Sequence, residues 1–317
     1  MDFLINFLGL CFSLAVLIWG ADKFVDSASA LAKRFGVNEL TIGLTVIALG
    51  TSAPEIFVGI SSVLNQSESI AMGAVVGSNI SNIALIFGVS CIGISYKPKD
   101  TPFVQFLPFL LSALVLGFCL KYLNISAFDG MLLLLVFIYF LYVTFKNKSI
   151  EDAGSSYDQS IGNGPLASIV LVSGLLALIL GSRYAVIYAE NIAVLLNISE
   201  LVIGLTIIAI GTSLPELAAT ISAILKKKTD MVVGNVIGSN VLNITLVVPI
   251  IGFFSTVQLE TILFSRDYLI MIIATVIFIS LVILCSSKYF NLTMIRLAGL
   301  LLIFAYFFYL LSLGNLV

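Results

Sequence analysis

The sequence predicts an all-α integral membrane protein with ten transmembrane helices in two inverted five-helix repeats. Three observations predict this class: an apolar composition, ten stretches long enough to cross a bilayer, and two motifs that recur at a fixed spacing. Of the 317 residues, 60% are hydrophobic and only 10% are charged, whereas roughly a quarter of the residues in soluble domains are charged. The mean hydropathy of +1.16 points the same way.

The predicted spans are apolar stretches of about 20 residues, the length needed to cross roughly 30 Å of hydrocarbon. We expect them at 3–35, 40–64, 70–95, 103–123, 128–145, 166–196, 201–225, 231–254, 267–287 and 294–313. The first stretch is expected to be a retained helix rather than a signal peptide, because Asp2 stands where a signal peptide carries Lys or Arg. Near its inner end, Asp22, Lys23 and Asp26 are expected to have a structural role, in which they can pair or reach the membrane interface.

A polar segment divides the spans into two groups of five. Residues 146–165 are rich in Gly, Ser, Asn and charged residues, which is typical of a linker. We therefore expect a first repeat at 1–145, a linker at 146–165 and a second, inverted repeat at 166–317.

Lys and Arg favour the cytoplasmic side of membrane proteins, so their distribution predicts the orientation. With both termini outside, the external connections hold only Lys121 and Arg266. The cytoplasmic connections then hold Lys33, Arg34, Lys97, Lys99, Lys146, Lys148, Lys226, Lys227, Lys228, Lys288 and Arg296. We expect a protein of the plasma or inner membrane, with its linker in the cytoplasm.

Two motifs recur 161 residues apart. The stretch Ile42 to Glu55, IGLTVIALGTSAPE, matches Ile203 to Glu216, IGLTIIAIGTSLPE, at eleven of fourteen positions, and Gly73 to Ile83 matches Gly234 to Ile244 at seven of eleven. Because each copy has five crossings, an odd number, the second copy enters the membrane from the opposite side. Inverted repeats of this kind are typical of transporters.

The first motif predicts a broken helix at membrane depth. Proline removes an amide donor, and the adjacent Gly, Thr and Ser let the backbone open. We expect carbonyls around Ala48 and Thr51, and around Ala209 and Thr212, to lose their helical partners and become available as ligands. The alternative is a proline kink that has no role in ion binding. This alternative is disfavoured because the motif occurs twice and each copy contains a carboxylate.

Glu55 and Glu216 are predicted to share a cation site. An unpaired carboxylate at mid-bilayer costs about 3 kcal/mol, and no Lys or Arg lies in the central parts of the neighbouring predicted helices. The counter-charge is then an exchangeable cation or a proton. Carboxylate and carbonyl oxygens suit Ca²⁺, which takes about six to eight oxygens, better than Mg²⁺ or soft metals.

The second motif supplies neutral oxygens. Ser78 and Asn82 are four residues apart, as are Ser239 and Asn243, so each pair lies on one helical face. The neighbouring glycines also fit the small-residue packing of membrane helices. We expect both roles, and neutral oxygens suit Na⁺.

Several other classes of function are disfavoured. The chain has no histidine, and Cys11, Cys91, Cys119 and Cys285 stand singly in apolar runs, so they are expected to be packing thiols rather than zinc or haem ligands. The net charge of −2 and the scattered basic residues argue against nucleic acid as a partner. We predict no catalytic residues, no cofactor and no protein partner.

These motifs, G-T-S-x-P-E and G-S-N in each half, resemble the sodium/calcium exchangers of the calcium:cation antiporter superfamily, of the compact prokaryotic type. The resemblance implies that Glu55 and Glu216 are the central Ca²⁺ and Na⁺ ligands, with the carbonyls of Thr51 and Thr212 beside them. It implies flanking Na⁺ sites formed by Ser52, Ser213, Ser78 and Ser239 with the carbonyls of Ala48 and Ala209. It also implies that Asn82 and Asn243 complete the middle of the site. It also implies exchange of about three Na⁺ for one Ca²⁺, with the long first and sixth helices sliding as a gate.

The sequence departs from part of that family at Asn243, where some members, including the potassium-dependent branch, carry aspartate. This departure argues against K⁺ co-transport. Three rival functions stay open: a proton-coupled Ca²⁺ exchanger of the same fold, a passive cation channel, and an intramembrane hydrolase. The neutral Ser and Asn oxygens favour Na⁺ over protons, the internal two-fold repeat argues against an oligomeric pore, and Ser52 lacks a histidine or lysine base.

Overall fold

The computed structural model describes residues 2–64, 68–94, 97, 101–146, 164–196, 211, 213–255, 258–287 and 289–313. In these residues the structure is helical, apart from one isolated bridge between Asn124 and Gln258. Eight of the described helices are long and apolar enough to cross a membrane, or nine if the bent pair Glu39–Thr51 and Ala53–Ser61 is one span. The all-α membrane class is therefore confirmed. The predicted span at 201–225 lies partly outside the described residues, so the count of ten stays a prediction.

The helices of the first half begin and end close to the predicted spans. The first, α1, is Asp2–Arg34. The second span is broken into α2 (Glu39–Ile42), the π-helical η1 (Gly43–Ile47), α3 (Ala48–Thr51) and α4 (Ala53–Leu64). The remaining three spans are formed by α5 (Glu68–Ser81), η2 (Asn82–Phe87) and α6 (Gly88–Gly93), by η3 (Phe103–Gln105) and α7 (Phe106–Leu120), and by α8 (Ala127–Lys146).

The second half has the same kind of succession. Its described elements are α9 (Gly164–Leu195), α12 (Leu214–Leu225), α13 (Thr229–Leu242), η5 (Asn243–Val247), α14 (Val248–Phe254), η6 (Leu263–Tyr268), α15 (Leu269–Ser286) and α16 (Leu292–Leu313). The ninth span begins at Leu263 and not at residue 267 as predicted. The charged residues there are tolerated in the helix because Asp267 accepts hydrogen bonds from Arg266 Nε (2.8 Å) and from the Tyr309 hydroxyl (3.1 Å).

Helix boundaries recur at the spacing of the sequence motifs. Both ends of α4 lie 161 residues before the ends of α12, and the same holds for α5 and α13. A π-helical segment follows each of the latter two, beginning at Asn82 in η2 and at Asn243 in η5. The two halves thus share their local breaks as well as their motifs.

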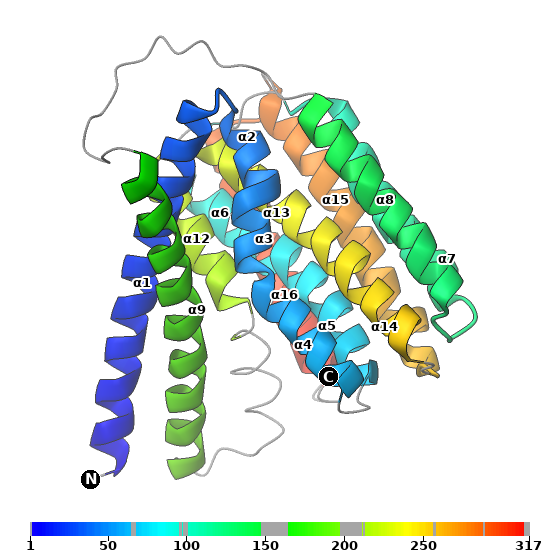
Figure 1. The fold of residues 1–317 in the computed structure, drawn as a ribbon, viewed down its shortest axis with the longest axis horizontal. Helices are drawn as coiled ribbons and strands as arrows, with labels where there is room; N and C mark the ends of the chain where they lie inside the picture. Colours follow the sequence, from blue (N-terminus) through cyan, green and yellow to red (C-terminus); the bar gives the residue numbers. More distant parts are fainter. Residues whose placement is uncertain are drawn as a thin grey trace.

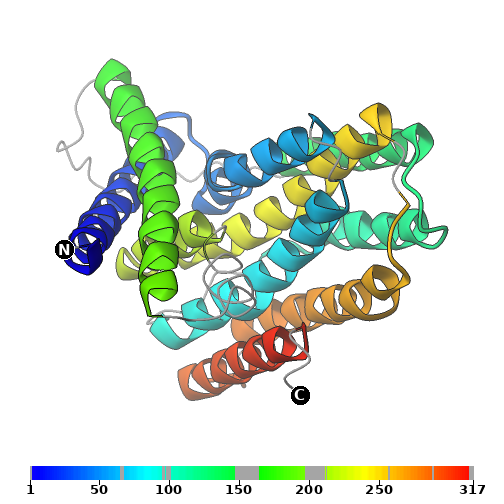
Figure 2. The same cartoon turned by 90° about the horizontal axis from the view of Figure 1, so that it is seen from below.

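Burial identifies the centre of the bundle. In the most apolar windows of Ala71–Gly93 and Thr229–Phe254, 83% of residues are buried, against 17% in α1. Figure 1 shows α13 running through the middle, while α1 and α9 lie side by side at one edge; Figure 2 shows the same pairing from below. The outer helices expose large apolar side chains such as Phe12 and Phe304, as expected for surfaces in contact with lipid.

Ion pairs join α1 to the turn after α12. Lys226 Nζ lies 2.5 Å from Asp22 Oδ1 and 2.8 Å from Asp26 Oδ1, and it also donates to the Asp22 carbonyl at 2.7 Å. Lys23 is 3.6 Å from Asp22. The expected pairing of the charged residues near the end of the first span is therefore confirmed, and its main partner lies on another element.

Candidate functional site

The broken helix predicted around Ser52 is present. α3 ends at Thr51, Ser52 has a non-helical backbone (φ −84°, ψ 4°), and α4 starts at Ala53 with its axis bent by 42°. Pro54, which has no amide hydrogen to donate, stands in the first turn of α4. The break lies near the midpoint of the Glu39–Leu64 stretch, far from both of its ends.

In the second half a helix starts at the equivalent position. Ser213 is the N-cap of α12, with a backbone (φ −93°, ψ 6°) close to that of Ser52, and Pro215 stands at the start of the helix. Glu55 and Glu216 lie in the first turns of α4 and α12, respectively. Helix N-termini favour carboxylates because their first amides have no helical acceptor. This local geometry fixes where both acidic groups lie.

Both carboxylates are buried and close to each other. Glu55 is 5% exposed and Glu216 is 1% exposed, and Glu216 accepts a hydrogen bond from Ser52, three residues before Glu55. Neither has an ion-pair partner among the residues that the structure describes, and Oε2 of each lacks a hydrogen-bond partner there. A buried pair of like charges in this state requires a counter-charge.

Polar contacts connect the two halves around these carboxylates. The Ser52 hydroxyl donates to Glu216 Oε1 at 3.3 Å, and the Ser81 hydroxyl donates to Ser213 Oγ at 3.1 Å. The Asn82 amide donates to Asn240 Oδ1 at 3.2 Å. Residues 132 to 164 positions apart in the chain therefore meet in one polar cluster.

Ten of the twelve predicted site residues lie in the described part of the chain, and all ten are buried, with at most 6% exposure each. They are Ala48, Thr51, Ser52, Glu55, Ser78, Asn82, Ser213, Glu216, Ser239 and Asn243. Oδ1 of Asn82 and both polar side-chain atoms of Asn243 lack partners in that part of the chain. Ala209 and Thr212 lie outside the described residues, so their predicted roles stay predictions.

One detail of the expected backbone opening is wrong. The Ala48 carbonyl keeps a helical partner, because the Ser52 amide still donates to it at 2.9 Å. We expected the backbone to open around Ala48, whereas this hydrogen bond is kept and the helix breaks at Ser52. A carbonyl has two lone pairs, and the Thr51 hydroxyl lies 3.4 Å from this oxygen, so the Ala48 carbonyl can still act as a ligand.

Sequence reasoning missed four polar residues of the cluster: Ser81, Thr220, Asn235 and Asn240. Ser81 and Asn240 belong to the second motif in each half, but the four-residue spacing selected only one face of each helix. Asn235 hydrogen-bonds Thr51 and Thr220. Because Ala74 and Gly59 stand at the matching positions of the first half, the repeat gave no signal for Asn235 or Thr220.

Among metal ions, the arrangement fits a hard cation. Its donors are two carboxylates, hydroxyls, carboxamides and carbonyls, which select Ca²⁺ or Na⁺ over soft metals. No group of three or more His, Cys, Asp or Glu side chains occurs in the described ranges. The neutral oxygens must therefore complete any coordination sphere.

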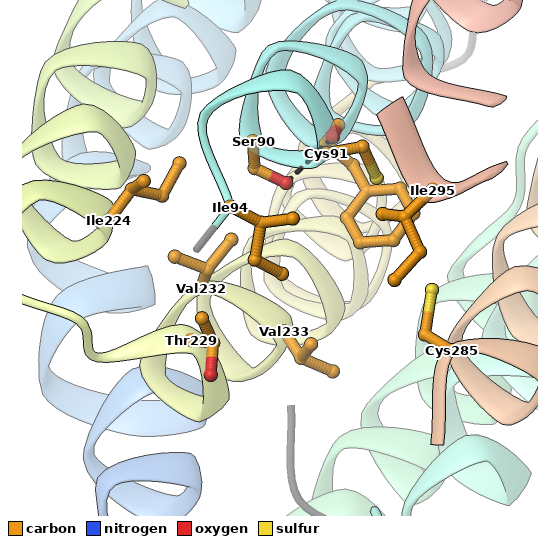
Figure 3. A pocket seen from close by; sticks show the side chains of 10 residues that line it. Ser90, Cys91, Ile94, Ile224, Thr229, Val232, Val233, Cys285 and Ile295 are labelled. Carbon is orange, nitrogen blue, oxygen red and sulfur yellow. Dashed lines mark hydrogen bonds between the residues drawn. The ribbon is translucent and has the colours of Figure 1, made fainter. Parts of the chain in front are cut away.

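A pocket elsewhere in the bundle has different chemistry. Figure 3 shows it lined by the labelled Ser90, Cys91, Ile94, Ile224, Thr229, Val232, Val233, Cys285 and Ile295. It is apolar apart from two hydroxyls and two thiols, and no carboxylate lines it. Cys91 and Cys285 are buried and free, as is Cys119, whereas Cys11 is exposed. The pocket is not a cation site.

Buried, oxygen-lined acidic groups on broken helices of an all-α membrane protein define the class of membrane ion transporters. The chain belongs to the sodium/calcium exchanger protein family, whose model matches residues 5–146 and 166–314. The resemblance inferred from the motifs is thereby confirmed, and the two matched ranges leave the linker unmatched.

Relatives and solved structures cover most of the chain. It is 35% identical over 281 residues to the inner membrane protein YrbG of Escherichia coli (strain K12), covering 85% of this chain and 86% of YrbG. It is 33% identical over 291 residues to the sodium/calcium exchanger MaX1 of Methanosarcina acetivorans, covering 79% and 83%. A structure of the sodium-calcium exchanger NCX_Mj, soaked with 2.5 mM Na⁺ and 0.1 mM Ca²⁺, is similar with a TM-score of 0.81 at 30% identity, covering 98% of both chains.

Proposed function

We propose that this protein is a secondary active antiporter that exchanges Na⁺ for Ca²⁺ across the membrane. The observation that carries the proposal is the buried pair Glu55 and Glu216, each with an unpartnered oxygen and no basic partner among the described residues. One Ca²⁺ neutralises both charges, and Na⁺ ions are the alternative occupants. Alternation between these two loads couples the two fluxes.

The ligands support this pairing of ions. Two carboxylates match the charge of Ca²⁺, and the surrounding hydroxyl, carboxamide and carbonyl oxygens bring the number of donors toward the six to eight or so that Ca²⁺ takes. The neutral oxygens of Ser52, Ser213, Ser78 and Ser239 suit a monovalent ion. The similarity to MaX1 and NCX_Mj, both sodium/calcium exchangers, further supports Na⁺ as the coupling ion.

The proposed architecture is ten helices in two inverted five-helix repeats, at 1–145 and 166–317, joined by the linker 146–165. The identical offset of α4 from α12 and of α5 from α13 supports it. Gly234 and Gly238 make close backbone contact with the Leu40–Leu44 region.

The proposed location is the inner or plasma membrane, with both termini outside and the linker in the cytoplasm. The name of YrbG, an inner membrane protein, supports the location. The distribution of Lys and Arg supports the orientation. Membership of an exchanger family gives no support to a passive channel.

Purified protein in proteoliposomes tests the coupling ion. We expect ⁴⁵Ca²⁺ uptake into Na⁺-loaded vesicles in Na⁺-free buffer, and loss of that uptake when Na⁺ is equalised or replaced inside by choline. A pH gradient of matched size without Na⁺ should drive no uptake. Uptake that follows the pH gradient and ignores Na⁺ would identify the proton-coupled exchanger instead.

A further inference from the structure

Asn235 lies at the edge of the polar cluster, one helical turn before Ser239 on α13, and is 2% exposed. Its Oδ1 accepts hydrogen bonds from Thr51 Oγ1 at 3.4 Å and from Ser239 Oγ at 3.5 Å. Ser239 is a predicted Na⁺ ligand, and the carbonyl of Thr51 is a predicted ligand of the central ion. Asn235 therefore directs a carboxamide oxygen at the same place as they do.

These contacts are long for hydroxyl hydrogen bonds. Away from the cluster, the hydroxyls of Thr45, Thr245 and Ser112 reach backbone carbonyls at 2.7, 2.7 and 2.8 Å, close to the usual distance of about 2.7–2.8 Å. In the cluster, Thr51 Oγ1 is 3.4 Å from the Ala48 carbonyl, and Ser52 Oγ is 3.3 Å from Glu216 Oε1. The oxygens of the cluster are spaced more widely than direct hydrogen bonding requires.

The wider spacing is that of ligands around a cation. Oxygens held roughly 2.3–2.6 Å from a six-coordinate ion of the size of Ca²⁺ lie about 3.3–3.7 Å apart along the edges of the octahedron, and Na⁺ has nearly the same radius. The consecutive oxygens Ala48 O, Thr51 Oγ1, Asn235 Oδ1 and Ser239 Oγ are separated by 3.4, 3.4 and 3.5 Å. Four neutral oxygens thus have the spacing of one coordination sphere.

Thr220 is the hydrogen-bond partner of the NH₂ group of Asn235, opposite this sphere. Asn235 Nδ2 donates to Thr220 Oγ1 at 3.4 Å, so the NH₂ group points to α12 and Oδ1 points to Thr51 and Ser239. Thr220 is 1% exposed and lies one turn after Glu216. It is placed to orient a ligand without contacting the ion.

This pair breaks the internal repeat. At the 161-residue offset, Asn235 corresponds to Ala74 and Thr220 corresponds to Gly59. Neither Ala74 nor Gly59 has a polar side-chain atom, so the first half has no counterpart of this oxygen or of the group that orients it. The two ends of the proposed site differ in their donors.

We propose that Asn235 Oδ1 is a direct ligand of a Na⁺ ion held with the Ala48 carbonyl, Thr51 and Ser239, and that Thr220 is its positioning residue. The inference rests on the proposed Na⁺/Ca²⁺ exchange and assigns one of its Na⁺ positions. Na⁺ is the occupant because all four oxygens are neutral, whereas Ca²⁺ requires the carboxylates. The Na⁺ position on this side therefore includes a carboxamide oxygen that has no equivalent at the matching position of the first half.

Equilibrium ⁴⁵Ca²⁺ binding to purified protein, with Na⁺ as the competitor, tests the assignment. We expect Asn235→Ala and the nearly isosteric Asn235→Leu to raise the Na⁺ concentration that displaces half of the Ca²⁺ by about fivefold or more, with Ca²⁺ affinity in Na⁺-free buffer changed less than twofold. Asn235→Asp, which keeps an oxygen at this position, should not raise it. Thr220→Val should give a smaller rise than Asn235→Ala.

Thr245→Val is the matched control for Thr220→Val, since the Thr245 hydroxyl is buried but bonds its own helix at 2.7 Å. It should leave Na⁺ competition unchanged.

An unchanged Na⁺ midpoint in folded Asn235→Ala or Asn235→Leu, or equal loss of Na⁺ and Ca²⁺ affinity, would overturn the assignment. If neither variant folds, Thr220→Val and Asn235→Asp carry the same test. Failure of wild-type protein to bind Ca²⁺ competitively with Na⁺ would instead contradict the proposed function.

Discussion

Ser52 donates a hydrogen bond to Glu216 across 164 residues of sequence, with 3.3 Å between Oγ and Oε1. Ser52 is the residue at which the helix of the first half breaks, and Glu216 lies in the first turn of α12, whose N-cap Ser213 is the equivalent of Ser52. The two copies of one motif therefore form a single site. A substitution in either copy of the motif is therefore expected to change ion binding at this single site.

Exchange should not require K⁺. Asn82 and Asn243 are neutral, and the described site contains no third carboxylate that a K⁺ ion could neutralise. Replacing all K⁺ with choline should leave Na⁺-driven ⁴⁵Ca²⁺ uptake within about 20% of its original rate, provided the membrane potential is clamped at zero. A several-fold loss on K⁺ removal would contradict this prediction.

Exchange should respond to voltage. Three Na⁺ moving against one Ca²⁺ carry one net charge per cycle, worth about 2.3 kcal/mol per 100 mV, or roughly fifty-fold in the attainable Ca²⁺ gradient. An inside-negative potential, imposed with a K⁺ ionophore, should accelerate Ca²⁺ exit from vesicles, and the opposite potential should slow it. Flux that ignores voltage, with a reversal point that follows the square of the Na⁺ ratio, would indicate electroneutral exchange.

The Lys226 ion pairs should contribute modestly to stability. Lys226 binds Asp22 and Asp26 and so joins α1 to the end of α12, but these groups are partly exposed. Exposed pairs contribute about 0.2–1 kcal/mol each and are screened by salt. Lys226→Met should lower the free energy of unfolding by about 1 kcal/mol at low salt, with a smaller loss at high salt, as measured by thermal unfolding in detergent.

Lys146→Met is the control for that measurement, because Lys146 bonds only Tyr142 of its own helix among the contacts described. It should have little effect at either salt concentration. A salt-independent loss in Lys226→Met would assign the effect to packing rather than charge.

The close approach of α13 to η1 should not tolerate a methyl group. A Cβ built at Gly234 would meet the carbonyl of Leu40 far inside van der Waals contact, and neither backbone can move independently. Gly234→Ala should destabilise the protein by about 1–3 kcal/mol. In Gly93→Ala the nearest atom is Ile224 Cγ2 at 3.2 Å, on a flexible side chain, so thermal unfolding should change much less. Equal stability of the two variants would contradict this packing.

Hydropathy and periodicity predicted most of the fold. The apolar stretches place eight of the ten spans within a few residues of described helices, and the repeated motif predicted the break at Ser52. The start of the ninth span was missed because Arg266 was assigned to an external connection, whereas it pairs with Asp267, which also accepts a hydrogen bond from Tyr309. Local sequence does not show that a distant tyrosine will satisfy a charge.

Some residues of the candidate site could likewise be predicted from the sequence, and others could not. Glu55, Glu216 and the Ser and Asn pairs carry a signal in the repeat, so they could be found from sequence. Asn235 and Thr220 could not, because the hydrogen bonds of Asn235 with Thr51 and with Thr220 depend on how α12 and α13 pack against α3. The π-helical segments that begin at Asn82 and Asn243 likewise have no distinctive local composition.

The central claim is that Glu55 and Glu216 together bind the exchanged Ca²⁺. Its most direct test is Na⁺-driven ⁴⁵Ca²⁺ uptake by Glu55→Gln and Glu216→Gln in proteoliposomes, with Glu68→Gln, an acidic residue at the start of α5 and outside the site, as the control. Each site variant removes one of two charges that balance a divalent ion, so uptake should fall at least a hundredfold while the protein still folds and inserts. Glu68→Gln should retain wild-type uptake. Uptake near the wild-type rate in either well-folded site variant would contradict the account.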